Sequence, residues 1–539
     1  MRVLGIEGTA WCASAALYDA ETDDMFIESD PYEPDSGGIH PREAAEHMTE
    51  AIPEVVDRTL SHAEREHGPD AVDAVAFSRG PGLGPCLRTV GTAARALAGG
   101  LDVPLVGVNH MVAHLEIGRH ESGFEDPVCL NASGANAHLL GYHDGRYRVL
   151  GETMDAGVGN AIDKFTRHIG WDHPGGPKVE AAAREADGDE LVDLPYVVKG
   201  MDFSFSGISS AANDAYDDGV PVEEICFSLQ EHVFAMLTEV SERALSLTGA
   251  DELVLGGGVG QNDRLREMLS SMCAERGASF YAPDARYLRD NAGMIAVLGA
   301  QMAGAGDTLA IPASSIDPNF RPDEVPVTWR SDAASVVGAD DVGRGGGTGR
   351  RGAEALVERR SDRIVKRRLR KAYRHPELDR TVRRDRTVSE ARLTSEARRA
   401  GVPTPLVYDV DVANATLTLQ HVGDRDFAAE PTTARAATVG RHLARLHGAG
   451  IVHGDPTTRN VRVDDGDDSA VRLIDFGLGY HAGHVEDHAM DLHVFEGSIA
   501  ATTDDPGPLI DAVEQSYREV GDEAVLTRLR DVERRGRYR

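Results

Sequence analysis

The segment HGDPTTRN, residues 453–460, followed by IDFG, residues 474–477, decides the fold of the last third of this chain. Asp455 lies five residues before Asn460, and Asp475 opens the D-F-G triplet. A carboxylate at position 455 can accept the proton of an attacking hydroxyl. Asn460 and Asp475 offer the oxygen ligands that hold Mg²⁺ against a triphosphate. The spacing therefore predicts a phosphoryl-transfer site with Asp455 as its catalytic residue.

This layout is typical of protein kinases, and the residues upstream extend it. Lys366 in the strand-like segment IVK fits the lysine that grips nucleotide phosphates, and Glu390 fits its helical partner. HGD replaces the usual HRD, and no A-P-E segment follows Asp475, so broad protein phosphorylation is not expected. We predict a small α+β bilobal kinase-like domain with Mg²⁺ and ATP as cofactors. The predicted ATP-binding residues are Gly352, Ala353, Glu354, Val357, Lys366, Glu390, Asn460 and Asp475.

Length and charge limit the class of protein. The chain has 539 residues, which exceeds one hydrophobic core and fits two or three domains. Its formal net charge is −33, from 89 acidic and 56 basic residues, while 41% of the residues are hydrophobic. Disorder requires fewer apolar residues, so the excess of carboxylates favours a folded protein adapted to high salt.

Cysteine usage and hydropathy indicate the compartment. The five cysteines are scattered without a C-x-x-C pair, which argues for a reducing environment rather than a disulfide scaffold. No stretch approaches the roughly 18 apolar residues of a membrane span, and the N-terminus lacks the apolar core of a signal peptide. We therefore expect a cytoplasmic protein that does not contact a membrane.

The first 322 residues alternate short strands with helices, which predicts an α/β fold. Strands are expected at Val3–Ile6 and Glu252–Leu255, for example, and a long helix at Val222–Ser246. A duplicated α/β architecture would produce this pattern. Residues 323–348 are rich in Gly, Asp and Ser and are interpreted as a flexible linker to the kinase-like domain at 349–539.

After the linker the local charge inverts. Residues 351–400 hold 17 Lys and Arg against 8 Asp and Glu. Such a run is often only a solvated surface. Within a chain this acidic, it also suits contact with phosphate, with RNA or with the acidic first domain.

Two patterns in the first domain suggest ligand sites. The strands VLGIEGTA, residues 3–10, and ELVLGGGVGQN, residues 252–262, both end in small-residue turns that can bind phosphate through backbone amides. NHMVAH places His110 and His114 four residues apart on one helical face, a spacing that fits metal ligands but also occurs without one. Asp290 is a candidate third ligand, and two His with one carboxylate suit Fe²⁺ or Zn²⁺.

Nine short motifs of the first domain occur in an order that resembles one family. They are GIEGTA, SRGPGLGPCLRT, NHMVAH, SGAN, AIDKF, GGPKVE, FSFSG, GGGVGQN and DNAGMIA, spread over residues 5–296. Together they resemble the tRNA threonylcarbamoyladenosine transferases, once called O-sialoglycoprotein endopeptidases, within the two-lobed actin/hexokinase/Hsp70-like superfamily. The C-terminal motifs resemble the small atypical kinase of the KEOPS complex. The order of the two parts resembles an archaeal fusion of both proteins.

The resemblance implies that residues 1–322 transfer threonylcarbamoyl from its adenylate to N6 of the adenosine next to the anticodon in ANN-reading tRNAs. It implies one Fe²⁺ or Zn²⁺ on His110, His114 and Asp290, and an ATPase or Ser/Thr kinase in residues 349–539. Its implied partners are tRNA, threonylcarbamoyl-adenylate, ATP and the small KEOPS subunits. The residues that match the adenylate site are Asn131, Ala132, Ser133, Gly134, Ala135, Asp163, Gly176, Glu180 and Asn262.

One departure and two alternatives follow from the same residues. The family has a metal-binding Tyr where this chain has Asn131, so either the Asn131 amide or water would take that position. A metalloprotease is one alternative, although Met111 occupies the place of the Glu in H-E-x-x-H. The other is a signalling kinase with a nucleotide-sensing domain.

Overall fold

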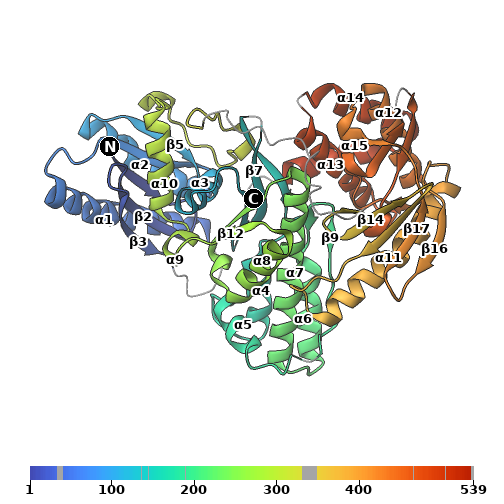
Figure 1. Ribbon diagram of the computed structural model, residues 1–539. Coiled ribbons are helices and arrows are strands. Elements are labelled where there is room, and N and C mark those ends of the chain that lie inside the picture. The colour runs from blue at the N-terminus through green and yellow to red at the C-terminus, as the bar shows by residue number, and fades with distance from the viewer. Residues whose placement is uncertain are drawn as a thin grey trace.

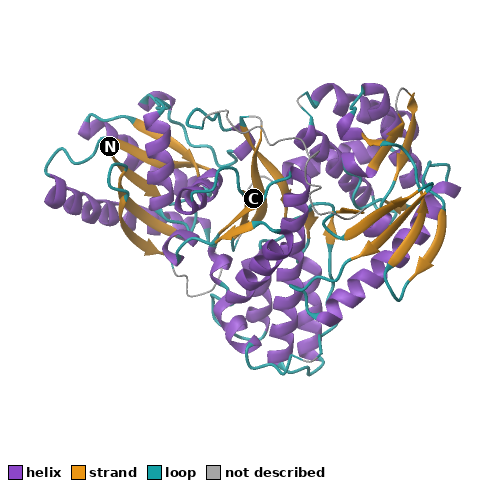
Figure 2. Cartoon of the chain, viewed as in Figure 1, coloured by secondary structure: helices purple, strands orange, loops and turns teal. Residues whose placement is uncertain are grey.

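The computed structural model describes residues 1–32, 40–134, 136–143, 145–188, 190–330, 349–464, 467–503 and 505–535 (Figure 1). The predicted mixed α/β class is confirmed, with helices and strands distributed along the whole chain. Figure 2 shows the strands gathered in separate groups, at the left and in the centre for the first domain and at the right for the second. Among the described helices, none combines the length and the apolar composition needed to cross a membrane.

The first lobe is a five-stranded sheet with the strand order β3-β2-β1-β4-β5. Strand β1 is antiparallel to β2 and parallel to β4, so the sheet joins an antiparallel hairpin region to a parallel pair. Alanine, valine and isoleucine side chains fill both faces, because helices cover the sheet on each side. Its elements are β1 (Arg2–Glu7), β2 (Cys12–Asp19), β3 (Asp24–Pro31), α1 (Pro41–His67), β4 (Ala74–Gly80), α2 (Gly84–Leu101), β5 (Leu105–Asn109), α3 (His110–Ser122) and α10 (Ala292–Gly304).

The second lobe repeats this pattern with the strand order β12-β11-β6-β7-β8. Strand β6 is antiparallel to β7 and parallel to β11, as β1 is to β2 and β4. The shared pattern is that of a duplicated α/β unit. Its elements are β6 (Val128–Ala132), β7 (Ala137–His143), β8 (Arg146–Glu152), α4 (Val158–His168), α5 (Gly176–Ala183), β9 (Val198–Lys199), β10 (Asp202–Phe203), α6 (Ser206–Asp217), α7 (Val222–Thr248), β11 (Glu252–Gly256), η1 (Gly258–Gln261), α8 (Asp263–Arg276), β12 (Ser279–Tyr281) and α9 (Ala285–Leu288).

The chain then returns to the first lobe. Helix α10 packs against β1, β2 and β4, which lie far from it in sequence (Figure 1). The segment predicted as a linker, 323–348, begins with residues that pack on this domain. Val325 is buried, Trp329 stacks on Tyr147, and Arg330 pairs with Glu116 at 3.4 Å. Residues 331–348 lie outside the described part of the chain.

The second domain combines a five-stranded sheet with a helical region. Its sheet has the antiparallel order β13-β14-β15-β17-β16, and helix α11 lies beside it (Figure 1). The sheet elements are β13 (Gly349–Arg351), β14 (Ala355–Arg360), β15 (Arg363–Arg368), α11 (Pro376–Arg399), β16 (Val407–Asp411) and β17 (Thr416–Gln420). The rest of the domain contains α12 (Thr433–Gly448), α13 (Val485–Thr502), α14 (Gly507–Val520) and α15 (Glu523–Arg535), with the short strands β18 (Arg425–Asp426), β19 (Ile451–Val452), β20 (Val461–Asp464), β21 (Asp467–Leu473) and β22 (Tyr480–His481).

Candidate functional site

The candidate metal centre joins the start of α3 to the loop before α10. Asn109, the last residue of β5, caps α3 by accepting hydrogen bonds from the amides of Met111 and Val112. The cap fixes the first turn of the helix, so His110 and His114 point from the same face. Asp290 directly precedes Asn291, whose side chain caps α10 and also donates to the carbonyl of Arg289. Two helix starts therefore bring together residues that lie far apart in sequence.

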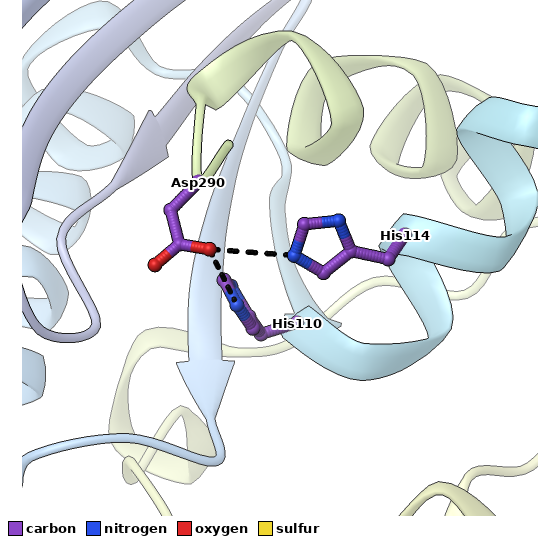
Figure 3. A group of neighbouring side chains, drawn as sticks. All are labelled: His110, His114 and Asp290. Carbon is purple, nitrogen blue, oxygen red and sulfur yellow. Dashed lines mark hydrogen bonds and ion pairs between the residues drawn. The ribbon is translucent and has the colours of Figure 1, made fainter. Parts of the chain in front are cut away.

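The three predicted ligands meet closely (Figure 3). Oδ1 of Asp290 lies 3.3 Å from Nε2 of His110 and 3.3 Å from Nε2 of His114. Ligand atoms of the three side chains lie within 4.8 Å of one another, and both imidazoles are buried. Three protein ligands would leave at least one coordination position of a bound ion open, as in catalytic rather than structural metal sites.

Electrostatics at the triad reflects its dense charge. Burial alone would lower the pKa of His110, but the carboxylates of Glu7 and Asp290 raise it to about 10. Burial opposes ionisation of Asp290, yet the two imidazoles hold its pKa far below the usual range. Burial lowers the pKa of His114, which keeps that ring neutral and able to donate a lone pair.

Unpartnered polar atoms surround the triad and show that the site suits a bound ion. Among the described residues, buried atoms without a hydrogen-bond partner include His114 Nδ1, Asn131 Oδ1 and both ring nitrogens of His138. Gly256 lies against both His114 and Asn131, since a Cβ added to it would lie 3.5 Å from Cβ of His114 and 3.7 Å from Oδ1 of Asn131, so Asn131 lies in the neighbourhood of the triad. Native interiors rarely leave such groups unsatisfied. Two imidazoles and a carboxylate, with an amide oxygen nearby, form a donor set that fits Fe²⁺ or Zn²⁺.

The residues that match the adenylate site form a connected group in the second lobe. Asn131 and Ala132 end β6. The carbonyls of Ser133 and Gly134 accept hydrogen bonds from amides in the first turn of α4, and Asp163 lies further along the same helix. Oδ1 of Asp163 accepts from the Gly175 amide at 2.7 Å, directly before Gly176.

Glu180 and Asn262 lie at the next corner of the same group. Oε1 of Glu180 accepts from the Asp263 amide at 3.1 Å, and Asn262 caps α8. The turns that follow the parallel strands β6 and β11 thus contribute to one region, as expected at the carboxyl ends of an α/β sheet. Ala135 lies outside the described residues.

The predicted phosphoryl-transfer residues also converge. Nζ of Lys366, on β15, lies 2.9 Å from Oε1 of Glu390 on α11 and 2.6 Å from Oδ1 of Asp475. Nδ2 of Asn460 donates to Oδ2 of Asp455 at 3.0 Å. Asp475 adopts a left-handed conformation, φ 64°, which is uncommon for a non-glycine residue and is held here by surrounding contacts. Val357 lies on β14, next to the loop of Gly352, Ala353 and Glu354.

The first domain contributes a residue to this second site. Arg243 of α7 lies 3.1 Å from Oδ2 of Asp455 through Nη1, and its Nη2 pairs with Glu354. A Cβ added to Gly200, in the β9–β10 turn, would lie 3.5 Å from Oδ1 of Asp455. Burial raises the pKa of Asp455 and Arg243 opposes the rise; with Asp475 and Glu354 nearby, the pKa stands at about 7.

Part of the basic block docks against the acidic helix α7. Nζ of Lys371 lies 2.5 Å from Glu242, and Nη2 of Arg374 lies 2.6 Å from Glu239. Arg386 also pairs with Glu239, at 2.9 Å. All five side chains are buried, so their charged groups interact with one another instead of with water. Arg367, Arg370, Arg380 and Arg384 of the same block remain exposed.

Two functional candidates escaped sequence reasoning. Glu7 contacts His110 at 3.1 Å, and its signal was an acidic residue inside the otherwise apolar stretch VLGIEG. Arg243 approaches Asp455 from 212 residues away, and nothing in its local sequence distinguishes it from other helical arginines.

Comparison with known proteins gives a consistent result. Residues 23–297 match the family model described as tRNA N6-adenosine threonylcarbamoyltransferase. Three relatives carry the name probable bifunctional tRNA threonylcarbamoyladenosine biosynthesis protein. The relative from Haloquadratum walsbyi is 66% identical over the whole of both chains, and that from Natronomonas pharaonis is 67% identical over 100% of this chain and 99% of its own. The relative from Methanoculleus marisnigri is 50% identical over 99% of this chain and 98% of its own.

Proposed function

The chain belongs to the tRNA N6-adenosine threonylcarbamoyltransferase family, and we propose that it divides the work of this modification between its two domains. It is a bifunctional enzyme of tRNA threonylcarbamoyladenosine biosynthesis. The first domain, residues 1–322, transfers threonylcarbamoyl from its adenylate to N6 of the adenosine next to the anticodon in ANN-reading tRNAs. The second, residues 349–539, hydrolyses ATP or phosphorylates Ser and Thr in support of that reaction.

The convergence of His110, His114 and Asp290 carries the proposal for the first domain. These residues would hold one Fe²⁺ or Zn²⁺. When bound, such an ion supplies a Lewis acid and a template for a carbonyl or carboxylate oxygen. Asn131 adjoins the triad and would either contact the ion or face it through water.

The chain's own residues would orient the adenylate between the two lobes. Ser133 and Gly134 follow β6 and Asn262 caps α8 after β11, while Asp163, Gly176 and Glu180 lie on the adjoining helices α4 and α5. The acceptor is a weakly basic amine, so holding it against the activated carbonyl supplies much of the rate. The metalloprotease alternative is not favoured, because the family match covers the histidine pair and Met111 lies beside His110.

For the second domain we propose a small kinase-like fold, which its five-stranded sheet followed by a mainly helical region supports. Lys366, paired with Glu390, would grip the phosphates of ATP, while Asn460 and Asp475 would hold Mg²⁺. Asp455 would accept the proton of the attacking group. Arg243 and the β9–β10 turn lie against Asp455, which leaves space for a small acceptor such as water more readily than for a folded protein. This supports ATP hydrolysis as the principal activity.

The proposed partners are tRNA, threonylcarbamoyl-adenylate, ATP and the small KEOPS subunits, in the cytoplasm. Four apolar side chains support a protein partner at the edge of the five-stranded sheet in the second domain. Leu406, Tyr408, Val410 and Val412 are all exposed, at alternate positions along or beside the edge strand β16. The pairing of β16 with β17 shifts register between Val407 and Asp409, and these side chains are exposed apolar groups gathered at one edge of the sheet.

Nucleoside analysis tests the proposed function. Total tRNA is digested from cells that depend on this chain and from cells depleted of it, and threonylcarbamoyladenosine is measured by mass spectrometry. We expect the modified nucleoside to disappear on depletion and to return with the wild-type chain. Unchanged modification after depletion would contradict the proposal and favour the signalling-kinase alternative.

A further inference from the structure

Glu7 is a buried carboxylate behind the metal triad that the proposed mechanism leaves without a role. It ends strand β1, where its neighbours Val3, Leu4 and Ile6 are core residues, and its side chain has no exposed surface. A carboxylate in such a position is stabilised only if its oxygens are fully hydrogen-bonded. Its contacts therefore indicate what it does.

Three donors converge on the two oxygens of Glu7. Oε1 accepts from the Thr9 amide at 2.7 Å, and Oε2 accepts from the hydroxyl of Ser78 on β4. Oε2 also lies 3.1 Å from Nδ1 of His110. Backbone and a neighbouring strand thus fix the carboxylate, so it presents a rigid acceptor to the imidazole.

The contact with His110 determines which ring nitrogen carries hydrogen. A carboxylate that accepts from Nδ1 keeps hydrogen on that atom, which leaves the lone pair of a neutral ring on Nε2. Nε2 is the atom that faces Asp290, at 3.3 Å. Glu7 and Asp290 lie on opposite sides of the ring, so Glu7 stands behind the ligand rather than in the coordination sphere.

The other histidine of the triad has no equivalent support. Nδ1 of His114 is buried and has no hydrogen-bond partner among the described residues. The two ligands of one helix therefore differ. The ring of His110 is anchored from behind, while that of His114 is held by packing and by Asp290.

We propose that Glu7 is a positioning residue that orients His110 for metal binding, with Ser78 and the Thr9 amide holding Glu7 in turn. The inference rests on the proposed metal centre and adds to it a carboxylate–histidine pair. Carboxylates that accept from metal-bound histidines fix the tautomer and increase ligand basicity, and their removal typically weakens metal affinity about 10–100-fold.

Metal titration of the full chain tests the proposal without reference to catalysis. Co²⁺ is added to metal-free protein, its visible absorption is recorded, and Zn²⁺ affinity is measured by competition with a chelator. Glu7→Leu, of similar size but without an acceptor, should weaken both affinities about 10–100-fold and change the Co²⁺ spectrum. Glu7→Gln keeps an acceptor oxygen and should restore most of the affinity.

Two controls separate this role from a structural one and from failure of the metal centre. Glu231→Leu removes another buried carboxylate of the same domain, one that pairs with Arg264 at 2.6 Å, and should leave Co²⁺ binding unchanged. His110→Ala should abolish binding at the triad. If His110→Ala has no effect, the metal centre itself is wrong, whereas loss in His110→Ala with wild-type binding in Glu7→Leu overturns only the role of Glu7.

A milder variant decides the case in which Glu7→Leu does not fold. Ser78→Ala removes one hydroxyl that donates to Glu7 and leaves the carboxylate in place. A weaker loss of Co²⁺ affinity in the same direction supports the proposal. Unchanged affinity and spectrum in folded Ser78→Ala would then overturn it.

Discussion

The two candidate sites differ in how much of the molecule they need. The metal triad, with Glu7 behind it, draws every residue from the first domain. The phosphoryl-transfer site draws Lys366, Asp455 and Asp475 from the second domain but is closed by Arg243 of the first. The first site is therefore self-contained and the second is composite. Loss of contact between the domains should affect the second site directly and leave the first intact.

The sharpest test of independence removes the triad. His110→Ala or Asp290→Ala should abolish threonylcarbamoyl transfer. We expect the loss to exceed about 10³-fold, because a site that does not hold the ion has no Lewis acid. ATP hydrolysis should persist near the wild-type rate, since neither residue contacts the second domain. Modified tRNA is measured by mass spectrometry and phosphate release in parallel. Normal modification by either variant would break the metal assignment.

The converse variants test the other direction. Asp455→Ala and Asp475→Ala should each reduce ATP hydrolysis by about 10²-fold or more, one through loss of the proton acceptor and the other through loss of a Mg²⁺ ligand. Co²⁺ binding to the first domain should remain unchanged. Phosphate release at the wild-type rate in both variants would show that the second site is not catalytic.

Substitution of Arg243 tests whether the phosphoryl-transfer site depends on both domains. Arg243→Ala removes a cation that pairs with Glu239, Glu354 and Asp455. Arg386 still pairs with Glu239 and Glu354, so we expect a destabilisation of about 3 kcal/mol, the lower end for breaking a buried pair. Denaturant unfolding measures the loss. Arg243→Lys retains the charge without the planar fork and serves as the matched control. Unfolding at the wild-type midpoint in Arg243→Ala would argue against a composite site.

The contact between Arg243 and Asp455 also predicts a dependence of activity and stability on pH. The pKa of Asp455 is raised from 3.8 to about 7, so ionisation costs folding free energy, and this contribution to stability declines as pH rises from about 4 through 7. Hydrolysis requires the carboxylate, so kcat/KM for ATP should rise with pH, with a midpoint near 7. Because Arg243 lowers the pKa of Asp455, Arg243→Ala should shift that midpoint upward. A pH profile that is flat in both proteins would remove Asp455 as the base.

The smallest expected effect concerns the exposed part of the basic block. Arg367→Gln with Arg370→Gln should weaken tRNA binding and reduce the log–log salt slope by roughly 0.7–0.9 for each lost phosphate contact. Lys371→Gln with Arg374→Gln is the matched pair, because those side chains are buried against α7 and should loosen domain contact instead. Equal slopes and affinities in the exposed pair and the wild type would rule out tRNA contact by Arg367 and Arg370 and leave domain contact by the buried side chains as the shown role of the block.

Sequence alone predicted both sites where spacing is local. His110 and His114 lie one helical turn apart, and Asp455 and Asn460 belong to one loop, so short-range geometry fixes each pair. Asp290 was a candidate third ligand that the family resemblance then supported, and its contact with both imidazoles depends on how α10 returns to the first lobe. The duplicated sheet pattern followed from the order of strands and helices.

The sequence could not predict contacts that packing creates between distant elements. Arg243 meets Asp455 only because α7 of the second lobe packs against the second domain. The basic block was open to two interpretations because charge counting cannot tell a buried arginine from an exposed one. Lys371 and Arg368 are buried while Arg367 and Arg370 are exposed, although the four are almost consecutive.

Helix α7 contacts residues of both proposed sites. Near its middle, Gln230 accepts from Asn262 at 2.8 Å, beside the proposed adenylate site, and Arg243 lies 13 residues later against Asp455. A rise of about 1.5 Å per residue separates these two points by roughly 20 Å along a single stiff axis. A movement of the helix along or about that axis changes the surroundings of Asn262 and of Asp455 at the same moment. One helix therefore contacts both proposed sites.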